Sequence, residues 1–140
     1  MLTASDLMSR DPVVARTTDS LSTAAKLFEA HSIHHLPVVE RGGLLVGLVT
    51  REDCFRARAQ GAGVTTALKE LMTRPVLTVT PDTPLQQTLD RLLQRHFRCL
   101  PVVEEDGKLV GIITGMDFAR LSRQTIQAID AQELAREWEH

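Results

Sequence analysis

Long apolar runs and an excess of either charge are both missing from this 140-residue sequence. No run approaches the roughly 18 apolar residues of a membrane span, and the N-terminus lacks the basic and apolar regions of a signal peptide. We therefore expect a cytoplasmic protein without a membrane span. The net charge of −2 offers no patch for a nucleic-acid backbone, which binds clustered lysine and arginine, so no nucleic-acid partner is expected.

Cysteine is scarce too. Cys54 and Cys99 share no CxxC spacing, so neither a zinc site nor a disulfide framework is indicated, and reduced, packed thiols are expected. The group His31, His34 and His35 also fails as a metal site, because a strand should begin near His35 and no carboxylate or thiolate completes the set. With no Ser-His-Asp order or nucleophile elbow, we expect neither a metal nor enzymatic activity.

What the sequence does contain is a repeat, in which residues 21–53 align with residues 85–117 without a gap. Twelve of the 33 pairs are identical, where average residue usage would give roughly two by chance. The first members, each matched 64 residues later, are Leu21, Leu36, Pro37, Val38, Val39, Glu40, Gly43, Leu45, Val46, Gly47, Thr50 and Asp53. A unit of about 60 residues buries a marginal core alone, so we expect two units packed as a pseudo-twofold pair.

Both units show one order of elements. A short helical piece ends in Leu-Met-Ser/Thr-Arg before Pro12 or Pro75, since proline disfavours helix at the residue before it. A strand-forming stretch, an amphipathic helix and two strands joined by a glycine turn follow. The expected ranges are helical pieces at 5–9 and 66–73, strands at 13–15 and 76–79, helices after Asp19 or Ser20 and after Asp82 or Thr83, and hairpin strands at 36–40, 44–50, 100–104 and 108–114.

The remaining segments are a linker and a tail. Gly61 and Gly63 break helix between the units, so we expect a first unit at 3–58, a linker at 59–65 and a second unit at 66–123. In the tail at 124–140, apolar residues such as Ile126 and Trp138 alternate with charged ones, which predicts an amphipathic extension of the last helix. That extension either packs on its own domain or binds a partner or second copy, and the sequence leaves both open.

A short motif carries the chemistry in each unit. Thr50-Arg-Glu-Asp53 and Thr114-Gly-Met-Asp117 both follow a strand and begin a helix. The helix N-terminus favours an anion such as phosphate, and a carboxylate one turn later can accept from the hydroxyls of a ribose. Thr-x-x-Asp is also close to a plain capping box, and only its repetition after the same hairpin favours the binding role.

These motifs, in the same order twice, resemble tandem cystathionine β-synthase (CBS) domains over about residues 3–123. The resemblance implies an α/β (α+β) fold of two β-α-β-β-α units packed sheet to sheet with pseudo-twofold symmetry. It also implies two equivalent clefts that bind adenine nucleotides: AMP, ADP, ATP or S-adenosylmethionine. No obligatory cofactor is expected, and the adenine nucleotide is the regulatory ligand.

The resemblance also assigns residues to the clefts. Ribose and phosphate contacts map to Thr50, Asp53, Thr114 and Asp117, and backbone contacts to adenine map to Val13, Val14, Val76 and Leu77. A basic residue two positions before Leu-Pro reaches phosphate, which gives Arg98 in the second unit. The first unit has His34 there, and histidine is largely neutral at pH 7, so we expect two unequal sites. Arg10 and Arg74 form either a positive rim or cations favourable to a helix C-terminus.

Two functions are compatible with this resemblance. The first is a regulatory module that binds an adenine nucleotide, forms a homodimer and signals to a separate effector protein. The second is a ligand-free dimerisation scaffold with vestigial clefts, which the retained Thr and Asp of both motifs disfavour.

Overall fold

The repeat of the sequence folds twice into the same local structure in a computed structural model that describes residues 1–96 and 98–138. The fold is mixed α+β, with two three-stranded sheets of order β1-β6-β5 and β2-β3-β4. Its elements are α1 (Ala4–Leu7), β1 (Ser9–Arg10), β2 (Ala15–Arg16), α2 (Leu21–His31), β3 (His35–Glu40), the 3-10 turn η1 (Arg41–Gly43), β4 (Leu44–Thr50), α3 (Arg51–Ala59), the 3-10 turn η2 (Leu68–Glu70), α4 (Leu85–Gln94), β5 (Cys99–Val103), β6 (Leu109–Thr114) and α5 (Gly115–Trp138).

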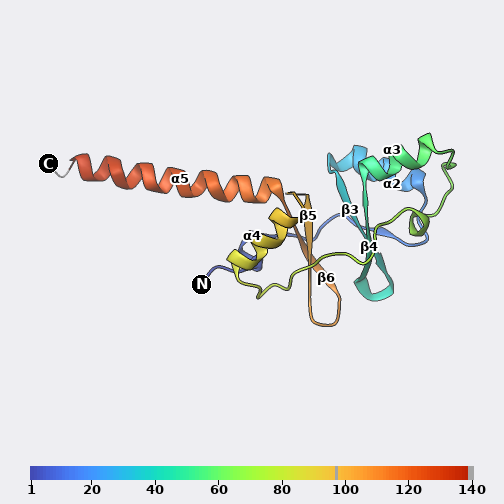
Figure 1. The fold of residues 1–140 in the computed structure, drawn as a ribbon, viewed down its shortest axis with the longest axis horizontal. Helices are drawn as coiled ribbons and strands as arrows, with labels where there is room; N and C mark the ends of the chain where they lie inside the picture. Colours follow the sequence, from blue (N-terminus) through green and yellow to red (C-terminus); the bar gives the residue numbers. More distant parts are fainter. Residues whose placement is uncertain (97, 139–140) are drawn as a thin grey trace.

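The two predicted hairpins are confirmed, and they keep the 64-residue offset of the sequence. Leu36 lies opposite Val49 in the first hairpin, and Leu100 lies opposite Ile113 in the second. The turns require glycine, because Gly42, Gly43 and Gly107 all have φ between 82° and 90°, a region that other residues avoid. Figure 1 shows both hairpins extending toward the same side of the molecule.

The predicted strands at 13–15 and 76–79 form only in part, because each of these segments crosses from one sheet to the other. Ser9–Arg10 pairs with β6, whereas Ala15–Arg16 pairs with β3 in the other sheet. In the second repeat Thr73 pairs with Leu48 of β4, and Val79 pairs with Val102 of β5. Residues 11–14 and 74–78 therefore span the gap between the sheets and belong to no strand.

The leading segment of each repeat packs into the core of the other repeat. Ala4 and Leu7 of α1 are buried with Leu92 and Leu100 of the second repeat. Leu68, which is fully buried, lies in the core of the first repeat, and Leu71 and Met72 pack against that core. The two halves therefore hold each other together by exchanging their first 3–10 or α-helical turn.

A repeated glycine accommodates this exchange. A Cβ added to Gly47 would overlap the side chain of Met72, and one added to Gly111 would lie 2.5 Å from Sδ of Met8 and 3.1 Å from the backbone oxygen of Ser9. Both separations are shorter than ordinary van der Waals contact. The Leu-Val-Gly of each β4 or β6 strand is therefore explained by the methionine that reaches it from the opposite repeat.

The C-terminal extension forms a continuous helix, as predicted, but it does not pack on its own domain. Figure 1 shows α5 projecting far beyond the two sheets. Ile126, Ile129, Leu134 and Trp138 are all at least half exposed. A single amphipathic face is also absent from this described part of α5, because the five-residue step from Ile129 to Leu134 turns the helix by about 140°.

Candidate functional site

Two clefts lie where the crossing segment of one repeat meets the hairpin of the other. The first, which we call cleft 1, has a volume of about 260 Å³, and the second, cleft 2, has about 680 Å³. Cleft 1 is lined by His35, Leu48, Thr50, Glu52, Asp53, Arg56, Thr73, Pro75, Val76, Leu77, Arg95, Arg98 and Cys99. Cleft 2 is lined by Ser9, Arg10, Asp11, Pro12, Val13, Ser32, Ile33, His34, His35, Arg98, Ile112, Thr114, Gly115, Met116, Asp117 and Arg120.

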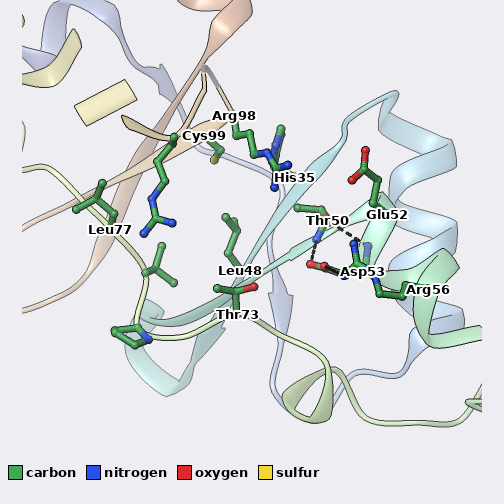
Figure 2. A pocket seen from close by; sticks show the side chains of 13 residues that line it. His35, Leu48, Thr50, Glu52, Asp53, Arg56, Thr73, Leu77, Arg98 and Cys99 are labelled. Atoms are coloured by element: carbon green, nitrogen blue, oxygen red, sulfur yellow. Dashed lines mark hydrogen bonds and ion pairs between the residues drawn. The ribbon is translucent and has the colours of Figure 1, made fainter. Parts of the chain in front are cut away.

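In cleft 1 the motif forms a capping box at the start of α3. The backbone N–H of Thr50 donates to Oδ2 of Asp53 over 2.9 Å, and the backbone N–H of Asp53 donates to the Thr50 hydroxyl over 3.0 Å. The other carboxylate oxygen accepts from Arg56 over 3.3 Å. Figure 2 shows Thr50 and Asp53 on one side of the cleft and Leu77 of the second repeat on the other.

In cleft 2 the equivalent carboxylate is more enclosed and has an additional partner. Asp117 is 5% exposed, and it accepts from the Thr114 backbone N–H over 2.9 Å and from Arg120 over 3.2 Å. The Ser9 hydroxyl, which comes from the first repeat, donates to Oδ1 of Asp117 over 3.0 Å. This bond joins the two repeats inside the cleft, 108 residues apart in the sequence.

The structure brings nine of the ten predicted site residues to the clefts. Thr50, Asp53, Val76, Leu77 and Arg98 line cleft 1, and Val13, His34, Thr114 and Asp117 line cleft 2 together with Arg98. Val14 lines neither cleft and is 37% exposed. The predicted adenine contacts are also not on a strand, since they lie in the segments that cross between the sheets.

The two arginines of Leu-Met-Ser/Thr-Arg take different positions. Arg10 lines cleft 2 and donates to the Ser5 hydroxyl over 3.3 Å, which agrees with the positive-rim interpretation. Arg74 is not among the lining residues of cleft 1. The rim is therefore present at one cleft.

Burial shifts the pKa values of His35, Cys54 and Cys99. Desolvation, with the nearby charges of His34 and Arg98, lowers the pKa of His35, so this imidazole stays neutral at pH 7. Desolvation and then Asp117 raise the pKa of Cys99 to about 12, and desolvation raises the pKa of Cys54. Both thiols are free, buried and protonated, which is unlike a reactive cysteine.

Sequence reasoning missed one repeated cleft residue and one repeated motif. Ser9 and Thr73 occupy the same position in Leu-Met-Ser/Thr-Arg and line the two clefts, and their shared hydroxyl was the available signal. Thr3-Ala-Ser-Asp6 is a third Thr-x-x-Asp, and it forms a capping box at α1 with a 2.8 Å bond from the Thr3 N–H to Asp6. The motif alone therefore makes a cap, and the crossing segment opposite it makes a cleft.

None of the helices formed by residues 1–96 and 98–138 has an apolar stretch long enough to cross a membrane. The same described residues contain no group of three or more His, Cys, Asp or Glu side chains placed to hold a metal ion. The three histidines considered above are separated by a helix end, since α2 stops at His31 and β3 begins at His35.

Comparison with known proteins identifies the family. The CBS domain model matches residues 4–60 and again residues 68–123, so the chain belongs to the CBS domain family and carries a tandem pair. It is 35% identical over 116 residues to the L-aspartate semialdehyde sulfurtransferase of Methanocaldococcus jannaschii. That match covers 83% of this chain and only 22% of the enzyme's length, so the similarity is to one part of that protein.

Solved structures of CBS domain pairs share the fold. The CBS domain pair of protein MJ0100, in complex with 5′-methylthioadenosine and S-adenosyl-L-methionine, is 33% identical, with a TM-score of 0.80 over 89% of this chain and 98% of that one. CBSX2 in complex with AMP is 29% identical, with a TM-score of 0.81 and the same coverage. Both complexes show that pairs of this fold hold adenosine ligands.

Proposed function

We propose that this protein is a regulatory module that binds adenine nucleotides in its two clefts. The observation that carries the proposal is the composition of each cleft, in which the Thr-x-x-Asp helix start of one repeat faces the apolar crossing segment of the other. A helix N-terminus suits phosphate, a carboxylate suits ribose hydroxyls, and an apolar segment suits a base. The adenosine ligands of the two related structures support the same ligand class.

The carboxylates are free to exchange a partner on binding. In each motif one oxygen is held by the threonine N–H, and the other by an arginine three residues later. Arg56 and Arg120 have side chains 61% and 63% exposed, so each guanidinium can turn into solvent. A ribose hydroxyl that donates to the carboxylate in place of the arginine keeps that oxygen hydrogen-bonded while the cap remains intact.

Cleft 2 is the site that fills first in this proposal. Its volume of about 680 Å³ lies within the roughly 300–1,000 Å³ typical of small-molecule sites. Cleft 1, at about 260 Å³, falls below that range and has to widen for the same ligand.

The signal would pass through the packing of the two repeats. A ligand in either cleft touches both repeats, so it stabilises the mutual arrangement that it binds best and shifts the population toward it. Phe55, Leu93 and Met116 leave large apolar side chains at least half exposed on α3, α4 and α5. We assign homodimer formation and contact with a separate effector protein to exposed apolar side chains of this kind.

A thermal-shift panel tests the proposal. AMP, ADP, ATP, S-adenosylmethionine and 5′-methylthioadenosine are added in turn, and at least one should raise the melting temperature because it binds the folded state. Asp53→Ala combined with Asp117→Ala should abolish the rise. Asp6→Ala is the matched control, since it removes the same kind of capping box outside both clefts and should leave the rise intact.

The scaffold function is the alternative, and the complete capping box at Thr50 and Asp53 favours it to the extent that the motif is satisfied without a ligand. It predicts no thermal shift with any adenosine compound. Light scattering distinguishes the two, because a scaffold keeps one oligomeric state with and without nucleotide.

A further inference from the structure

Arg98 borders both clefts. It lines cleft 1 and cleft 2, and also a third cavity of about 410 Å³ beside them. Its equivalent in the first repeat, His34, lines cleft 2 and the third cavity but not cleft 1. Figure 2 shows Arg98 next to His35, which is likewise common to both clefts.

The remaining cations are divided between the clefts. Arg95 and Arg56 line only cleft 1, whereas Arg10 and Arg120 line only cleft 2. Arg56 and Arg120 already pair with the motif carboxylates. Of the two equivalent residues Arg98 and His34, Arg98 carries the permanent charge, since histidine carries less charge than arginine at pH 7. That one charge borders both clefts.

We propose that Arg98 is a shared phosphate contact that makes the two clefts compete for anionic ligands. The proposal rests on the proposed nucleotide binding. A guanidinium presents its donors in one plane and pairs with one phosphate bidentately at a time. The second anionic ligand then meets a neutralised cation and the charge of the first ligand, so it binds more weakly. A neutral adenosine ligand makes no such demand and fills the two clefts independently.

Calorimetric titration with AMP and with 5′-methylthioadenosine tests the competition. Asp53→Ala and Asp117→Ala each leave a single working cleft, and their dissociation constants give the intrinsic affinities. In the unmodified protein the second AMP should bind about 5- to 20-fold more weakly than in the weaker single-cleft variant, which is a typical coupling between sites. The second 5′-methylthioadenosine should bind as it does in the single-cleft variants.

Two further variants locate the coupling at Arg98. Arg98→Gln should weaken AMP at both clefts and remove the coupling, and His34→Arg should remove it by giving the second cleft its own cation. Arg74→Gln is the matched control, because Arg74 lines neither cleft 1 nor cleft 2 and its removal should leave the coupling in place. If the unmodified protein binds one AMP only, the first ligand excludes the second completely. The His34→Arg variant must then bind two.

The outcomes separate this inference from the proposed function. Absence of binding by any adenosine compound refutes the function itself. Three results would refute only the sharing of Arg98. They are two AMP dissociation constants equal to those of the single-cleft variants, equal coupling for the neutral ligand, and coupling that persists in Arg98→Gln. A His34→Arg variant that keeps the coupling, or fails to open a missing second site, also overturns it.

Discussion

Clefts 1 and 2 are built on one frame and lined differently. Both join a Thr-x-x-Asp helix start to a segment that crosses between the sheets. The carboxylate side chain is 16% exposed in cleft 1 and 4% exposed in cleft 2, and only Asp117 receives a hydroxyl bond from the opposite repeat among the described contacts. The comparison teaches that the backbone frame is repeated, whereas the side chains that line the two clefts are not.

The largest expected effect on stability comes from the segment that the second repeat packs into the core of the first. Leu68 is fully buried in the first repeat's core, whereas its equivalent 64 residues earlier is Ala4. Leu68→Ala makes the two halves alike and should cost about 2–5 kcal/mol of the free energy of unfolding, as measured by urea denaturation. Native-state hydrogen exchange should quicken in β3 and β4. A loss no greater than that of Leu93→Ala, at an exposed position, would contradict the exchange of segments.

A methyl group added at Gly111, where the leading segment of the first repeat contacts β6, should have the next largest effect on stability. Gly111→Ala places a Cβ against Met8 and the Ser9 backbone, and such overpacking costs about 1–3 kcal/mol. Met8→Ala in the same chain should return part of the loss, because it removes the side chain that is in the way. Chemical denaturation of the single and double variants measures this, and a double variant showing the full sum of both losses would argue against the contact.

The two motif carboxylates should differ in their contribution to stability. Asp53→Ala removes one half of the capping box, the hydrogen bond from the Thr50 N–H, which is worth about 0.5–1.5 kcal/mol. Asp117→Ala also leaves the Ser9 hydroxyl without its acceptor, so its loss should exceed that of Asp53→Ala by about 1 kcal/mol. The comparison is made in unfolding experiments without ligand. In the Ser9→Ala background the difference between the two stability losses should shrink. Equal losses for Asp53→Ala and Asp117→Ala in the starting protein would refute the role of the Ser9 bond.

The smallest effect concerns pH. The pKa of His35 is lowered on folding, so below pH 6.5 the unfolded state binds more protons, and the free energy of unfolding falls as pH is lowered toward the folded pKa. Above pH 6.5 this penalty is absent. His35→Gln should therefore lose less stability than the starting protein between pH 7.5 and pH 5.5. Urea denaturation at the two pH values measures this. If the variant and the starting protein lose the same free energy of unfolding, His35 does not contribute to the pH dependence.

Much of the fold was predictable because its signals are local. The hairpins follow from Gly43 and Gly107 between β-branched runs, and the starts of α2 and α3 follow from their caps Ser20 and Thr50. The crossing of the leading segments was not predictable in this way. The segment Leu-Met-Ser/Thr-Arg and the glycine that its methionine contacts occur in both repeats, so the sequence does not say which methionine meets which glycine. The structure places Met8 against Gly111 and Met72 against Gly47.

The candidate site shows the same division. Its Thr and Asp residues recur in the sequence, the other six were assigned by the family resemblance, and nine of the ten line a cleft. The contact of Ser9 with Asp117 of the opposite repeat depends on the crossing and was missed. The helical tail was predicted, and whether it packs on its own domain was left open. The phase of Ile129 and Leu134, both at least half exposed, separates them around the helix.

A crystal structure grown with one equivalent of AMP tests the central claim most directly. The account predicts one nucleotide in cleft 2, with its ribose on Asp117 in place of Arg120 and its base against residues 11–13. Cleft 1 should be empty at that ratio, because it is the smaller cleft. AMP found in cleft 1 alone, in both clefts equally or outside the clefts would contradict it.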